Sequence, residues 1–256
     1  YVVITAKPEA LRMSYRGFPY EISGLKGNVV VDLRQDRVTI DKIVGSHGEH
    51  TIVGEAFVDF APHIADSAKP VRFKIGILSP DVVVDRELTA ALSQESQNLV
   101  DDFNFKGRVR VQVSVHSNEQ GAVEVTGDVD LHQASVRYKH FPYELSLAGG
   151  RLKILPRGAL LFENITTGDA ATPRLSFNGD MTTKEGQRTL GFKFDVEGLT
   201  FDDKLVDALP PFLQSFVVNL KLAGSYDGRI SGNYAFDGAN AERFSIIYMG
   251  ENIRTR

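Results

Sequence analysis

Apolar and polar residues alternate with a period of two along most of this chain. AVEVTGDVDL (122–131), VRVQVSV (109–115) and LGFKFDV (190–196) each place apolar side chains on one side and mostly polar ones on the other. Because neighbouring side chains of a strand point to opposite faces, the pattern predicts strands with one apolar and one polar face. Turn sequences rich in Gly, Asn and Pro separate the segments, which favours antiparallel pairing of sequential strands.

The sequence also contains an internal repeat. Phe-Pro-Tyr-Glu occurs at 18–21 and at 141–144, followed in both places by a serine and then a glycine at the same spacing. Similar segments follow in the same order: TIVGEAF (51–57) with LSFNGDM (175–181), VRFKIGI (71–77) with LGFKFDV (190–196), and VVVDRELTAAL (82–92) with LTFDDKLVDAL (199–209). We therefore expect two tandem β repeat units, over 1–120 and 121–256.

Helical signals are few. An acidic start and leucine spacing over 85–103 predict a helix near 86–100, and a shorter helix near 204–209 should end before Pro210. FVVNLKLAGSY (216–226) alternates and is predicted as a strand. The expected fold class is mainly β, with two tandem repeats of curved antiparallel sheet and one short helix in each repeat.

Two short helices can cover only part of the apolar faces that these strands would present. A second sheet in a sandwich, the same sheet curled over itself, or a non-protein ligand could cover the rest. Large exposed apolar patches normally mark an interaction surface. An open sheet would offer an apolar floor suited to acyl chains.

Composition excludes several classes of function. The formal net charge of −4 argues against general nucleic-acid binding, which needs a basic face. The absence of cysteine excludes disulfides, thiolate metal sites and cysteine nucleophiles. The chain begins with Tyr1, so we expect a fragment or a processed chain; it contains no apolar run of membrane-spanning length, so any anchor of the full protein should lie outside this segment.

No catalytic or metal-binding motif emerges. His47 and His50 flank Glu49, but the glycines of GSHGEH and the strand that follows argue against a metal pair. Asp85 and Glu87 suit a helix start better than acid–base chemistry. We expect no enzyme activity, cofactor or metal; a hydrolase with an unrecognised site is the weakest of the alternatives.

The repeat motif resembles a known family. FPYEISGLKGNV (18–29), FPYELSLAGGRL (141–152) and FDDKLVDALP (201–210) resemble bacterial AsmA-like envelope proteins, which are related to TamB and to the repeating β-groove, bridge-like lipid-transfer proteins. The resemblance covers about residues 13–238. It implies a long, taco-shaped sheet whose concave face carries phospholipid acyl chains between membranes. It also implies a place in the periplasm or cell envelope, with membrane anchoring through regions outside this segment.

The expected function is therefore non-enzymatic lipid binding or lipid transfer, with phospholipid or another acyl lipid as partner. The alternative is a structural or adhesive β-sandwich repeat module without lipid cargo. The candidate groove residues are the apolar members of the alternating strands: Val29, Val31, Ile52, Val58, Phe73, Ile75, Val109, Val111, Val113, Val123, Val125, Leu152, Ile154, Leu175, Phe177, Phe192, Phe194, Leu220 and Leu222.

The repeated motif itself has a structural interpretation. Proline cannot donate to a sheet ladder and belongs at a strand start or edge, so the motif predicts the entry of a strand braced by flanking aromatics. The alternative is that its aromatic residues line the mouth of a groove. Lys74 and Lys193 stand between apolar neighbours and should point away from the apolar face. The motif residues are Phe18, Pro19, Tyr20, Phe141, Pro142 and Tyr143.

Overall fold

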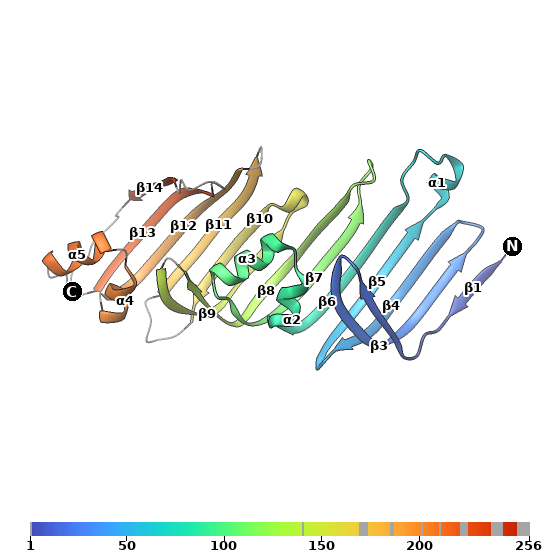
Figure 1. The fold of residues 1–256 in the computed structure, drawn as a ribbon, viewed down its shortest axis with the longest axis horizontal. Coiled ribbons are helices and arrows are strands. Elements are labelled where there is room, and N and C mark those ends of the chain that lie inside the picture. The colour runs from blue at the N-terminus through green and yellow to red at the C-terminus, as the bar shows by residue number, and fades with distance from the viewer. Residues whose placement is uncertain are drawn as a thin grey trace. The chain divides into compact units, whose positions relative to one another are not determined.

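The computed structural model describes residues 2–139, 141–168, 174–184, 187–200, 202–209, 211–220, 225–236 and 243–249. Strands dominate this part of the chain, so the mainly-β prediction is confirmed (Figure 1). Thirteen described strands follow one another across an open sheet in the order β1, β3, β4 and then β5 to β14, and β2 pairs with β3. Every register determined between paired strands is antiparallel.

The strands within the described residues are β1 Val3–Ala6, β2 Leu11–Tyr15, β3 Phe18–Asp32, β4 Arg37–His47, β5 His50–Asp59, β6 Arg72–Val83, β7 Lys106–Ser117, β8 Val123–Tyr138, β9 Phe141–Ile154, β10 Leu160–Thr167, β11 Arg174–Lys184, β12 Gln187–Thr200, β13 Ser225–Phe236 and β14 Arg243–Met249. The helices are α1 Ala61–Ala65, α2 Arg86–Ala91, α3 Gln94–Asp102, α4 Asp203–Ala208 and α5 Pro211–Leu220, with a 3₁₀ turn at Pro156–Gly158.

The chain divides into two compact units. Unit 1 comprises residues 1–92, 109–129 and 154–157, and unit 2 comprises residues 93–108, 130–153 and 158–256. Each unit draws segments from both expected repeats, 1–120 and 121–256, and that repeat boundary stays a prediction.

The single helix predicted near 86–100 is two helices, α2 and α3. Asp85 caps α2 by accepting a hydrogen bond from the backbone N–H of Leu88 at 2.8 Å. Ser93 caps α3 by accepting from the backbone N–H of Ser96, and Leu92 before it is extended, with ψ 164°. A good N-cap residue favours a new start over continuation of the previous helix. The prediction of one short helix per repeat is therefore wrong.

The strand predicted over 216–226 is wrong in its first half, because residues 211–220 form α5. Pro211 opens the helix, where its missing N–H costs nothing. The apolar residues 212, 216 and 220 recur every four positions, and this helical spacing overrides the period of two. Val217 is buried while Val218 is 62% exposed. Leu220 thus lies on a helix rather than on a sheet face, and Leu222 lies outside the described residues.

Two glycines of the repeated segments allow close approach of neighbouring strands. A Cβ on Gly27 would lie 2.8 Å from the Cα of Ile43, and a Cβ on Gly150 would lie 2.6 Å from the Cα of Ile165. The residue before each isoleucine has a positive φ, 45° and 49°, and the registers of β4–β5 and β10–β11 shift there. Each unit therefore contains a bulge held against a glycine, a parallel that supports the repeat hypothesis.

Candidate functional site

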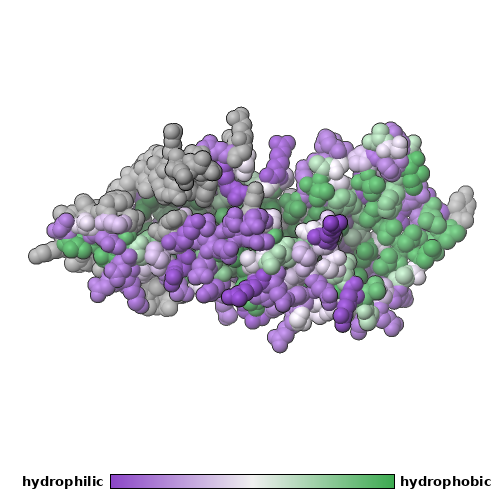
Figure 2. Space-filling model, viewed as in Figure 1, coloured by the Kyte–Doolittle hydropathy of each residue, from purple (hydrophilic) through white to green (hydrophobic). Residues whose placement is uncertain are grey.

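Unit 1 presents an apolar sheet face that crosses five strands. Strand pairing places two rows of side chains next to each other, and in Figure 2 hydrophobic residues gather over these N-terminal strands. Cross-strand neighbours in such rows lie about 5 Å apart, so the rows make a continuous surface. We call this surface the unit 1 apolar face; its rows are Ile4, Val31, Val38, Val58, Phe73 and Ala6, Val29, Ile40, Ala56, Ile75.

Helix α2 covers one end of this face. Tyr20, Ile52 and Ala91 are only 7%, 8% and 4% exposed and form a small core between β3, β5 and α2. Phe18, Ile22, Ile77 and Leu88 pack around it. No second sheet among the described strands lies over the two rows: Ile4 and Ile75 are 51% and 37% exposed, Ala6 is exposed, and the other seven residues are half-buried. In the described part of the chain, α2 closes one end of the face and no element closes the other end.

The opposite face of unit 1 is charged. Asp59, only 6% exposed, accepts a hydrogen bond from Arg72 at 3.2 Å and lies 3.6 Å from the guanidinium of Arg37. Lys74 pairs with Phe57 on this face, so it points away from the apolar rows as the alternation predicts. The two faces of one sheet thus differ sharply in chemistry.

Unit 2 presents an apolar face of aromatic rings. Phe177 lies 5.5 Å from Phe162 and 4.7 Å from Phe194 between ring centroids, and Phe192 lies 5.8 Å from Phe194. These residues come from β10, β11 and β12 and share one face through their registers. On the other face Asp195 is hydrogen-bonded to Arg229 and lies 3.5 Å from Lys193. Desolvation raises the pKa of Asp195, but both cations outweigh it and hold the pKa below its usual value.

Among the residues that the structure describes, neither apolar face lies in a closed core. Within the described residues no side chain is less than 2% exposed, and all described strands belong to one sheet rather than to two packed sheets. In a sandwich, the side chains of two sheets interdigitate and many become fully buried. Here the apolar residues are covered mainly by their neighbours in the same layer.

The structure places the predicted groove residues in different environments. Ile52 and Val109 are buried, while Ile75, Val123 and Val125 are 37%, 61% and 41% exposed. Leu220 lies on α5. The other described candidates are half-buried strand residues: Val29, Val31, Val58, Phe73, Val111, Val113, Leu152, Ile154, Leu175, Phe177, Phe192 and Phe194.

Several residues of these faces were missed in the sequence. Val38 and Ile40 lie in RVTI, a short alternation at the start of β4, and Ile4 lies on the short strand β1. Phe162 precedes the β10 bulge, which interrupts the alternation. Counting valine and isoleucine at every second position would have found Val38 and Ile40, whereas the bulge conceals Phe162.

The repeated aromatic motif stands beside a helix start in both units. Phe18 and Tyr20 lie 5.7 Å apart between ring centroids, and Phe141 and Tyr143 lie 6.0 Å apart. Burial and the charges of Asp85 and Glu87 raise the pKa of Tyr20 to about 12. Burial and the charge of Asp202 raise the pKa of Tyr143. Both aspartates are helix N-caps, so the motif tyrosines occupy similar places in the two units.

We expect Tyr20 to make stability depend on alkaline pH. A pKa raised from 10 means that the unfolded chain loses this proton first, so the contribution is intact below pH 10 and disappears as pH rises through about 12. The loss should reach about 2–3 kcal/mol. Tyr20→Phe should remove this part of the dependence with little cost at pH 7, because the described residues offer the hydroxyl no hydrogen-bond partner. Urea unfolding of the native chain and of Tyr20→Phe at pH 8 and pH 11.5 measures the free energy of unfolding of each protein. The same loss of stability in both proteins between these pH values would contradict the prediction.

His47 and His50 contact different partners and do not converge. His47 lies 2.9 Å from Glu87 through Nε2 and donates through Nδ1 to the carbonyl oxygen of Glu21, while its ring stacks on Tyr20. His50 contacts the carbonyl oxygen of Asp81 instead. Among the described residues no group of three or more His, Asp or Glu could hold a metal ion. The His47 contacts tie α2 to the sheet.

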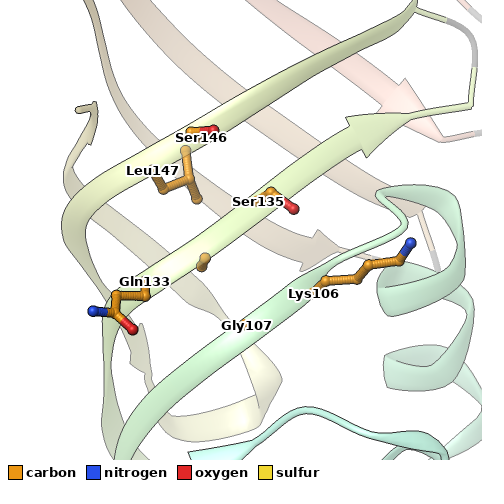
Figure 3. Close-up of a pocket in the computed structure, with 7 residues that line it drawn as sticks. Lys106, Gly107, Gln133, Ser135, Ser146 and Leu147 are labelled. Atoms are coloured by element: carbon orange, nitrogen blue, oxygen red, sulfur yellow. The ribbon is translucent and has the colours of Figure 1, made fainter. Parts of the chain in front are cut away.

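A shallow hollow of about 400 Å³ lies in unit 2 between β7, β8 and β9. Gly107 and Ala134 let two strands approach closely there, because a Cβ on Gly107 would lie 2.5 Å from the Cα of Ala134. In Figure 3 the polar ends of Lys106 and Gln133 point away from each other. Its polar groups do not converge, so the apolar faces remain the candidate site.

Comparison of the chain with family models, with curated proteins and with solved structures gave no match. None of the helices in the described residues is long and apolar enough to cross a membrane. A functional proposal therefore has to start from the sheet, which has an apolar face and a charged face.

Proposed function

We propose that the apolar sheet faces bind the acyl chains of phospholipid or another acyl lipid. The observation that carries the proposal is the pair of open rows of unit 1, whose ten residues are all apolar and have no second sheet packed over them among the described strands. An exposed apolar surface of this kind favours an apolar partner. The opposite face of the same sheet is charged and can stay in contact with water while the apolar face binds lipid.

The aliphatic rows fit an acyl chain in shape and energy. Full burial of a methylene contributes about 0.8 kcal/mol, so a sixteen-carbon chain lying half-buried on the floor gains about 6 kcal/mol. That corresponds to a dissociation constant on the order of tens of micromolar. Such reversible binding suits a protein that accepts and releases lipid.

The resemblance of the FPYE and FDDKLVDALP segments to AsmA-like proteins supports a wider proposal. We propose that this chain is part of a lipid-transfer protein of the periplasm or cell envelope, anchored through regions outside the segment. The bulges that pack against a glycine and the capped helices, which are common to both units, support the underlying repeat.

Titration of a fluorescent sixteen-carbon fatty acid into the purified chain tests acyl binding. We expect saturable binding in the tens of micromolar that an unlabelled sixteen-carbon acid displaces and a six-carbon acid does not. Mass spectrometry of lipid extracted from the purified protein should show co-purified acyl lipid. Absence of saturable binding, or equal competition by the six-carbon acid, would favour the structural or adhesive module.

A further inference from the structure

One end of unit 1 carries exposed apolar side chains on its strand connections. Leu33 lies in the β3–β4 turn, Phe60 and Ile64 lie in the β5–β6 connection, and their exposed fractions are 54%, 38% and 64%. Val2, before β1, and Val123, at the start of β8, are 52% and 61% exposed. We call these five residues the apolar rim.

The sheet registers and backbone contacts place the rim residues at the same end of the strands. Asp32, Arg37, Asp59 and Arg72 are paired in one row, so the β3–β4 and β5–β6 connections leave the sheet on the same side. The backbone N–H of Leu33 donates to Val2 O at 3.1 Å, which brings the chain before β1 to that side.

The later connections meet the same end. The Phe73 N–H donates to Ser117 Oγ at 3.0 Å, and a Cβ on Gly121 would lie 2.5 Å from the Cβ of Pro70. The β7–β8 turn therefore reaches the β5–β6 connection. Since strands are spaced about 5 Å apart, successive connections at this end lie about 10 Å apart.

Several hydrogen bonds hold the connection that carries Phe60 and Ile64. The backbone N–H of Phe60 donates to Asp36 O at 2.8 Å, and Asp59, which pairs with two arginines, accepts from Ala61 N at 3.2 Å. His63 contacts Lys69 O at 2.9 Å. Backbone and side-chain bonds thus hold this connection in place while Ile64 is 64% and Phe60 38% exposed to water.

The rim adjoins the open end of the unit 1 apolar face. The row of Val31, Val38, Val58 and Phe73 stands next to the strand ends from which the rim connections leave, while α2 closes the other end. The turns at that other end, Arg16–Gly17 and Gly48–Glu49, are polar and exposed. An apolar path therefore runs from the rim onto the face.

Charges at the rim are nearly balanced. Its connections carry Arg34 and Lys69 against Asp36, Asp66 and Glu119. A surface of this kind gains little from anionic lipid, which attracts basic clusters. Apolar side chains on separate turns suit a fluid interface better than a rigid partner, because each can insert independently.

We propose that the apolar rim docks unit 1 onto the surface of a lipid bilayer of zwitterionic lipid, and that acyl chains pass from there onto the unit 1 apolar face. This inference rests on the proposed function, because it names the surface by which lipid enters the same site. It further assigns the rim the role of membrane contact, which the sheet face alone does not provide.

Tryptophan fluorescence offers a direct test, because the chain contains no tryptophan. Phe60→Trp in the full chain should shift its emission to the blue when phosphatidylcholine vesicles are added, and the shift should persist at high salt. Tyr15→Trp, at the opposite end of β3 and 71% exposed in the native residue, should not shift. An unchanged spectrum for Phe60→Trp would overturn the proposal.

Co-sedimentation with the same vesicles gives the second measurement. The triple variant Leu33→Ser, Phe60→Ser, Ile64→Ser should bind at least about ten-fold more weakly than the native chain. The matched control Met13→Ser, Tyr15→Ser, Val218→Ser changes residues 50%, 71% and 62% exposed outside the rim and should bind as the native chain does. Equal loss in both variants, or a native dimer that the rim variant dissolves, would overturn membrane docking.

The fatty-acid titration in buffer without vesicles separates this inference from the proposed function. The rim variant should bind the free fatty acid as the native chain does, since the rows of the apolar face are unchanged. Fatty-acid binding without rim-dependent vesicle binding would overturn the proposal that the rim docks on a bilayer and would leave the proposed function intact. Rim-dependent vesicle binding without fatty-acid binding would support the rim as a membrane contact but overturn both the passage of acyl chains onto the face and the proposed function.

Discussion

Phe73→Asp should abolish fatty-acid binding while the protein stays folded. Phe73 lies in the open row of the unit 1 apolar face, where an added carboxylate stays hydrated until an acyl chain covers it. Covering an unpaired charge costs several kcal/mol, so the dissociation constant should rise on the order of 100-fold. The fluorescent fatty-acid titration measures the dissociation constant, and circular dichroism measures whether the variant is folded.

Phe57→Asp is the matched control for this change. Phe57 is on the neighbouring strand, 39% exposed, and faces the charged side of the sheet beside Lys74. The same substitution there should leave fatty-acid binding within about two-fold, because only solvent-exposed charge is added. Equal loss of binding in both variants would argue against a face-specific site, and unfolding of Phe73→Asp alone would indicate a closed core instead.

Gly150→Ala should be among the most destabilising single substitutions in the chain. The φ of Gly150 is 141°, and its Cβ would stand 2.6 Å from the Cα of Ile165, which cannot move without breaking the sheet. Strain and overlap together should cost about 3 kcal/mol or more. Thermal or urea unfolding followed by circular dichroism measures the loss.

Gly228→Ala supplies the comparison within the same sheet. A Cβ on Gly228 would meet no heavy atom within 4 Å, so alanine there should change stability by less than about 1 kcal/mol. Similar losses at Gly150 and Gly228 would show that the close approach of β9 and β10 is not what makes glycine necessary.

The alternation of apolar and polar residues was enough to predict the mainly-β class, because the period of two is imposed by strand geometry alone. It also placed Lys74 away from the apolar rows. The starts of α2 and α4 followed from Asp85 and Asp202, whose side chains bond the first turn of each helix. These features depend on neighbours in the sequence, which is why they could be predicted.

Other features depend on competition between two local sequence patterns or on contacts between residues that are far apart in the sequence. In α5, Phe216 and Leu220 belong to a strand pattern and to a helix pattern at once, and the period of two predicts the wrong element there. The break between α2 and α3 depends on Ser93, a cap signal inside a longer helical pattern. Periodicity does not predict the apolar rim, because Leu33, Phe60 and Ile64 lie in connections, where the fold decides which side chains are exposed.

The single-layer sheet has a thermodynamic consequence. Strands in this chain contact mainly the strands next to them, and no described side chain is fully enclosed. The free energy of unfolding is then a sum of contributions from neighbouring strands, as in repeat proteins, rather than the property of one core that unfolds as a unit. Heat would therefore loosen such a sheet strand by strand from its edges, and an acyl chain lying across several strands would couple them, adding cooperativity that the polypeptide alone does not have.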